Sequence, residues 1–111
     1  MTSSRVDHRT LASALRRRVL EGPGKTDPAV RHAAAARAAG GPRAESPCDD
    51  LARQIGESAS RVTNGQVADV LAATGSERAA VEGSAAAAVG AGLLRWGRAM
   101  DALEDAIDAP A

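Results

Sequence analysis

The sequence predicts an all-α protein of about five helices, which ends in a helical hairpin with one long Ala-rich helix. Apolar residues recur at spacings of three and four, and residues that favour helix ends stand between these stretches. No stretch alternates apolar with polar residues as a half-buried strand does. A length of 111 residues suits one small domain.

The first predicted helix precedes a loop of sequence GPGKTDP. Leu11, Leu15 and Val19 recur every four residues, and Gly22 is placed to end this helix near Leu20.

The second predicted helix begins with two residues typical of helix starts. Asp27 is a good N-cap, and Pro28 fits the first turn. The segment AVRHAAAARAA then runs as far as Gly40 and offers little to bury beyond Val30.

The loop from Gly40 to Pro47 is the expected flexible linker. It divides the chain into a basic helical segment, residues 1–43, and a helical-hairpin core, residues 44–111, which together are expected to form one domain. The first segment carries a net charge of +6 and the second a net charge of −6. Such complementary charges favour attraction between the segments or between subunits.

Arg16, Arg17 and Arg18 raise the alternative of a basic arm for nucleic acid. Three consecutive residues spread around a helix, however, and no aromatic residue in this segment provides a surface for base stacking. A weak nucleic-acid binder is therefore the third function considered, and the sequence argues against it.

Two further helices are predicted before the hairpin turn. Ser46 and Pro47 begin the third helix, and Thr63 and Gln66 have the spacing of a capping box for the fourth, which Gly75 ends. One face of the third helix carries Leu51, Ile55, Ala59 and Val62.

The fifth helix has the strongest periodic pattern. Ser76 caps it, and it extends to about Ile107. Its apolar positions, at alternating spacings of three and four, are Val81, Ala85, Val89, Leu93, Trp96, Met100, Leu103 and Ile107.

The apolar content of the chain is small for an independent core. It has 21 large apolar residues against 27 alanines, and at about 25 cal/mol per Å² their burial barely offsets the chain entropy. A homo-oligomer, or a complex with a related helical subunit, is therefore expected. The predicted helix-packing or subunit interface consists of Val89, Leu93, Trp96, Met100, Leu103 and Ile107.

An ordinary core within one chain is the alternative for this apolar stripe. Ala88 and Gly92, four residues apart, are expected to let a partner backbone approach closely, and Trp96 is expected to anchor the end of the contact.

Helix signals between residues 62 and 103 carry a family resemblance. They are Val62-Thr63 with Val67, Ser76-Glu77, Val81-Glu82, the run from Ala86 to Gly90, and Leu94-Arg95-Trp96. This stretch resembles the C-terminal helical hairpin of the carboxymuconolactone decarboxylase and alkylhydroperoxidase D-like superfamily. The resemblance implies an all-α fold, assembly through these helices and, for some members, thiol-dependent peroxidase chemistry.

The peroxidase members of that superfamily use a Cys-x-x-Cys pair with a nearby His, whereas Cys48 is single and both His8 and His32 precede it. Cys48 is the only candidate for a catalytic residue: a helix start lowers the pKa of a thiol, and Asp49 and Asp50 oppose this. The expected function is thus a non-catalytic, self-associating or partner-binding helical subunit. The alternative is an enzyme of the superfamily, antioxidant or decarboxylase-like, with an unidentified site.

Four acidic residues share one face of the fifth helix: Asp101, Glu104, Asp105 and Asp108. A site for a divalent cation needs oxygens that converge from several segments, so a docking face for the basic first segment is favoured over a metal site. No metal or cofactor is expected.

Cysteine usage and hydropathy indicate the compartment. A single cysteine cannot form an intrachain disulfide and suits a reducing environment. The first ten residues lack the apolar centre of a leader peptide, and no apolar run reaches the roughly 18 residues of a membrane span. A cytoplasmic protein without a membrane partner is expected.

Overall fold

The computed structural model describes residues 7–109. Residues 1–6, which belong to the segment considered for a leader, and residues 110–111 lie outside the described range. The helices in chain order are α1 (His8–Glu21), α2 (Pro28–Ala38), α3 (Cys48–Ser58), the 3₁₀-helix η1 (Ala59–Arg61), α4 (Asn64–Thr74) and α5 (Glu77–Asp108). Residues 7–109 contain no strand, and the prediction of an all-α fold with a long C-terminal helix is confirmed.

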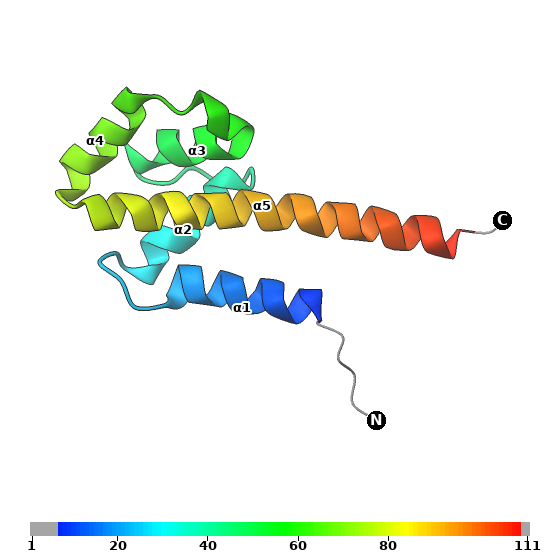
Figure 1. Cartoon of the computed structure of the whole chain (residues 1–111). Helices are drawn as coiled ribbons and strands as arrows, with labels where there is room; N and C mark the ends of the chain where they lie inside the picture. The colour runs from blue at the N-terminus through cyan, green and yellow to red at the C-terminus, as the bar shows by residue number, and fades with distance from the viewer. Residues whose placement is uncertain (1–6, 110–111) are drawn as a thin grey trace.

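Helix α5 is the central element of the molecule, because each of the other four α-helices packs against it. Figure 1 shows α1 on one side of α5, α3 and α4 on the other, and α2 crossing behind its N-terminal half. The C-terminal part of α5 extends beyond the other helices (Figure 1).

The boundaries of α2, α4 and α5 follow from caps and stops that the sequence predicted. The Asp27 side chain accepts a hydrogen bond from Ala29 N, and Thr63 and Gln66 form the complete capping box of α4. Gly75 ends α4 in the left-handed conformation, with φ of 65°, and the Ser76 hydroxyl caps α5 by accepting from Ala79 N.

Two expectations for the third helix are wrong, its start at Ser46 and the place of Val62 on its apolar face. Helix α3 begins at Cys48 without a side-chain cap, so Ser46 does not cap it. It ends at Ser58, where the chain tightens into η1, and Val62 therefore leaves the expected helical face and packs against a separate cluster. His8 is the first residue of α1, which begins there because the Asp7 carboxylate accepts from Arg9 N and Thr10 N.

Helix α2 buries more than the sequence suggested. Val30 is 44% exposed, whereas Arg31 and three alanines of α2 are buried. The larger of two core clusters joins this helix to α1, α3 and α5; its buried members are Leu20, Ala34, Ala35, Ala38, Ala52, Ala86, Ala87 and Ala91. The smaller cluster holds α4 against α3 and α5 through Leu51, Val70 and Ala80.

Close approach of the helices depends on two glycines that the sequence analysis did not select. A Cβ atom on Gly90 would collide with the backbone carbonyl of Ala35, and one on Gly56 would collide with that of Ala38. Ala88 and Gly92, the expected contact residues, are exposed, and a Cβ on Gly92 would meet nothing within 4 Å. The run of small residues in α5 therefore does contact another helix, but the contact to α2 is at Gly90 and not at Ala88 and Gly92.

We expected the loop between α2 and α3 to be a flexible linker. Asp49, in the first turn of α3, contacts both this loop and α2. Arg37 Nε lies 2.8 Å from Asp49 Oδ1, and the same oxygen accepts a hydrogen bond from Ala44 N at 2.9 Å.

Candidate functional site

The predicted interface residues of α5 change from partly buried to exposed along the helix. Val89, Leu93, Trp96 and Met100 are partly buried. Leu103 is 56% exposed and Ile107 is 79% exposed. Trp96 belongs to neither buried cluster, so it is not an anchor of the core within this chain.

Helix α1 packs along α5 and runs in the opposite direction, and the C-terminal end of α5 extends past it (Figure 1). Leu20, near the end of α1, packs in the cluster with Ala86 and Ala87, whereas Arg9, near its start, forms an ion pair with Glu104. The expected row of Leu11 and Leu15 is not in the core: the two side chains are 55% and 48% exposed. Only the C-terminal end of α1 reaches the core.

We use the name α1–α5 face for seven large apolar side chains that are exposed or partly buried on these two helices. It consists of Leu11, Leu15, Leu93, Trp96, Met100, Leu103 and Ile107. The radius of gyration is 16.3 Å, against about 13 Å for a compact domain of this length. The excess reflects the uncovered C-terminal part of α5.

The charges beside the α1–α5 face have opposite signs at its two ends. Arg16, Arg17 and Arg18 are exposed near the end of α1, and the four acids from Asp101 to Asp108 are exposed on α5. Within residues 7–109, no ion pair joins Arg16, Arg17 or Arg18 to these acids, and the one ion pair between α1 and α5 is the Arg9–Glu104 contact. The remaining charges of both groups are free to meet a second molecule.

Cys48 stands at the first position of α3 and lines a small apolar cavity between α2, α3, α4 and α5. Burial raises the pKa of this thiol, which lowers the fraction of reactive thiolate. The dipole of α3 therefore does not produce the low pKa of a redox thiol. His8 and His32 lie on α1 and α2; the structure brings neither a histidine nor a second cysteine into the lining of this cavity.

The acids of α5 form no metal site in the described part of the chain. No group of three or more His, Cys, Asp or Glu residues in residues 7–109 is arranged to hold a metal ion. Helix geometry spreads the four acids along one helix, and no second segment supplies further ligands.

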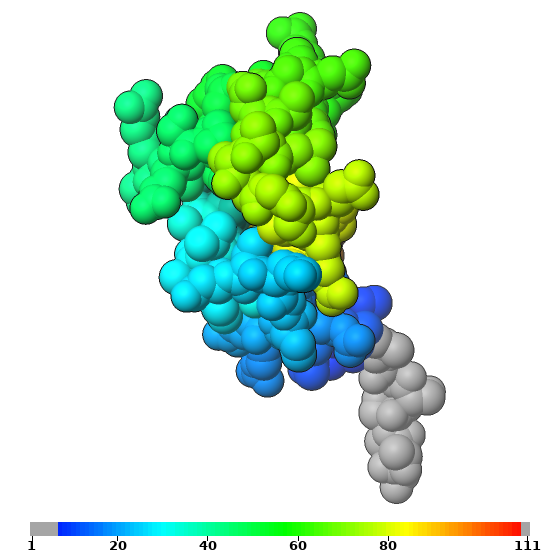
Figure 2. All heavy atoms as spheres, turned by 90° about the vertical axis from the view of Figure 1, so that its left-hand side faces the viewer, coloured from blue at the N-terminus to red at the C-terminus, as the bar shows by residue number. Residues whose placement is uncertain are grey.

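Glu82 is a residue whose importance the sequence analysis missed. Its carboxylate accepts hydrogen bonds from Lys25 N at 2.8 Å, Thr26 N at 2.9 Å and Thr26 Oγ1 at 2.7 Å, and from Arg78 Nε at 3.3 Å. These donors, the Lys25 amide first, lower the pKa of Glu82 to about 2. Figure 2 shows the resulting contact of the α1–α2 loop with the first turns of α5.

Arg31 holds the other side of the same loop. It is 3% exposed, and its guanidinium donates to the carbonyl oxygens of Val19 at 3.0 Å and Thr26 at 3.2 Å. It thus satisfies a carbonyl in the last turn of α1. An arginine in an Ala-rich helix is normally solvated, so the sequence contained no signal for this position.

No protein-family model, curated protein or solved structure matches this chain. The likeness of residues 62–103 to the carboxymuconolactone decarboxylase superfamily therefore stays a prediction. Within residues 7–109, no helix is long and apolar enough to cross a membrane.

Proposed function

We propose that this chain is a self-associating helical subunit, which forms a homodimer through the α1–α5 face. The observation that carries the proposal is the exposure of large apolar side chains on two neighbouring helices. Four of the six most exposed large apolar residues of the described chain are Leu11, Leu15, Leu103 and Ile107. Large apolar side chains that are exposed together are unfavourable in water, so such a group marks an interaction surface.

The charges favour a second copy as the partner. In a two-fold dimer with antiparallel α5 helices, the acidic end of one α5 reaches toward the Arg16–Arg18 end of the other α1. Each copy then supplies both halves of a complementary pair of patches, and the contact is repeated by symmetry. The net charge of zero leaves no overall repulsion between copies.

The test is the assembly state of two charge-insertion variants. We expect the wild type to sediment as a dimer at micromolar concentration and the double variant Leu103→Glu with Ile107→Glu to sediment as a monomer. Both side chains are exposed in the single chain, so circular dichroism of the double variant is expected to show unchanged helix content.

Val81→Glu is the matched control, since Val81 is 66% exposed on the same helix but lies outside the α1–α5 face. It is expected to leave the dimer intact. A monomeric wild type, or a double variant that still dimerises, would contradict the proposal.

A further inference from the structure

A groove of about 250 Å³ lies where α3, α5 and the C-terminal end of α2 meet. Four arginines line it: Arg37 from α2, Arg53 from α3, and Arg95 and Arg98 from α5. Among the described residues of the lining, Glu57 is the one acid. The groove is formed by helices other than α1 and is separate from the α1–α5 face.

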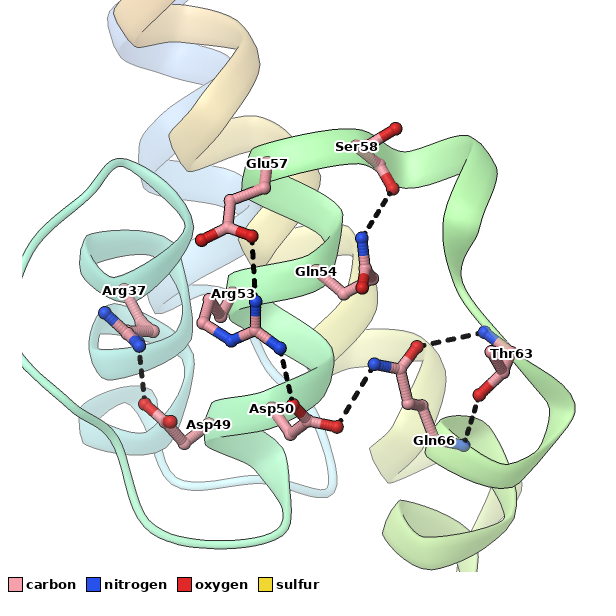
Figure 3. A network of polar contacts seen from close by, with 9 residues as sticks. All are labelled: Arg37, Asp49, Asp50, Arg53, Gln54, Glu57, Ser58, Thr63 and Gln66. Carbon is pink, nitrogen blue, oxygen red and sulfur yellow. Dashed lines mark hydrogen bonds and ion pairs between the residues drawn. The ribbon is translucent and has the colours of Figure 1, made fainter.

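Two of these arginines are already neutralised. Arg37 contacts Asp49 at 2.8 Å, and Arg53 contacts both Asp50 and Glu57 at 2.8 Å (Figure 3). These guanidinium groups are held in place by carboxylates of α3, so they shape the groove and contribute little free charge.

The other two arginines carry the excess positive charge. Arg95 Nη2 donates to the carbonyl oxygen of Gly56, which attaches this side chain to α3. Arg98 takes part in no ion pair or hydrogen bond within residues 7–109. The two are three residues apart on α5 and therefore share a face, where like charges repel each other.

We infer that this groove binds a phosphate monoester, whose phosphate group lies between Arg95 and Arg98. A bridging dianion relieves the repulsion between these side chains, and guanidinium groups donate paired hydrogen bonds to phosphate oxygens. Leu94 and Ala91 provide an apolar wall for the organic part of the ligand.

The test is a calorimetric titration of the full chain with inorganic phosphate and with phenyl phosphate, at constant ionic strength. We expect saturable binding of one phosphate group per chain. Arg98→Gln is expected to weaken binding about tenfold or more, because it removes a charge-assisted hydrogen bond. This variant should fold normally, since Arg98 has no partner within the described chain.

Arg61→Gln is the control, because Arg61 is exposed on η1 and does not line the groove. It is expected to bind both probes like the wild type. Binding that is unsaturable, unchanged in Arg98→Gln or equally weakened in both variants would overturn the assignment. Phenyl phosphate that binds more weakly than inorganic phosphate would overturn the role of Leu94 and Ala91.

Discussion

At the scale of single residues, the Glu82 carboxylate joins segments that are 56 residues apart in the sequence. One oxygen accepts from Lys25 N, and the other accepts from both Thr26 N and Thr26 Oγ1. Gly24 leaves room for this arrangement, because a Cβ there would lie 2.6 Å from a carboxylate oxygen. Two chain segments therefore depend on one ionised group.

Glu82→Gln is expected to lower the melting temperature at neutral pH. Glutamine has one side-chain acceptor atom, so its NH₂ group would face one of the N–H or O–H donors of the loop. Thermal melting followed by circular dichroism measures the difference. Glu45→Gln is the control, since Glu45 is exposed and its carboxylate accepts no hydrogen bond from this loop.

The wild type and Glu82→Gln also test how the stability of the fold depends on pH. The pKa of Glu82 is lowered from 4.5 to about 2 in the folded chain. As the pH falls below 4.5, the Glu82 carboxylate takes up a proton in the unfolded chain before it does so in the folded chain. The stabilisation of the fold by the ionised carboxylate is therefore complete above pH 4.5 and is lost as the pH falls toward 2. The gap in melting temperature between wild type and Glu82→Gln is expected to narrow over this range, and a constant gap would contradict the role of the charge.

At the scale of secondary-structure elements, α2 and α5 approach so closely that alanine and glycine are the residues that fit. The buried residues of α5 are all Ala or Gly: Ala79, Ala80, Ala86, Ala87, Gly90 and Ala91. Such a contact buries little area per residue, so its stability depends on close packing of the two backbones.

Gly90→Ala is expected to destabilise the fold by about 1–3 kcal/mol, which is typical of overpacking. The added methyl group would collide with the carbonyl of Ala35, so the two helices would have to separate. Gly92→Ala is the control two residues away: its Cβ meets open space, and alanine is favoured over glycine inside a helix by roughly 0.5–1 kcal/mol. Urea unfolding compares them, and equal stability of the two variants would show that the contact is looser than described.

At the scale of the whole molecule, the core and the α1–α5 face occupy different parts of α5. The last residue of α5 in a buried cluster is Ala91, whereas Leu103, Ile107 and the four acids are exposed toward the C-terminal end of the helix. Folding and self-association therefore depend on different ends of this helix.

A chain that ends after Met100 is expected to keep its fold but to sediment as a monomer. The truncation removes the exposed end of the α1–α5 face and the Arg9–Glu104 ion pair, and an exposed pair of this kind contributes about 0–1 kcal/mol. Sedimentation and thermal melting measure the two properties. If the shortened chain unfolds, or if it remains a dimer, the proposed division of α5 is wrong.

The sequence by itself determined the helices. Asp27, Thr63, Gln66, Gly75 and Ser76 act within one or two turns of the chain, and their roles as caps or stops depend on neighbouring backbone groups alone. The long periodic stripe likewise predicted α5 to within a residue or two of its end at Asp108.

The tertiary structure alone decided which helix faces meet. In this chain the alanines outnumber the large apolar residues, so the apolar pattern did not distinguish the buried face of α2 from its exposed one, and Gly90 and Gly56 rather than Gly92 became contact points. The hydrogen-bond partners of Glu82 and Arg31, and the arginines gathered in one groove, come from distant segments. Such placements depend on how whole helices pack, and no local sequence signal encodes them.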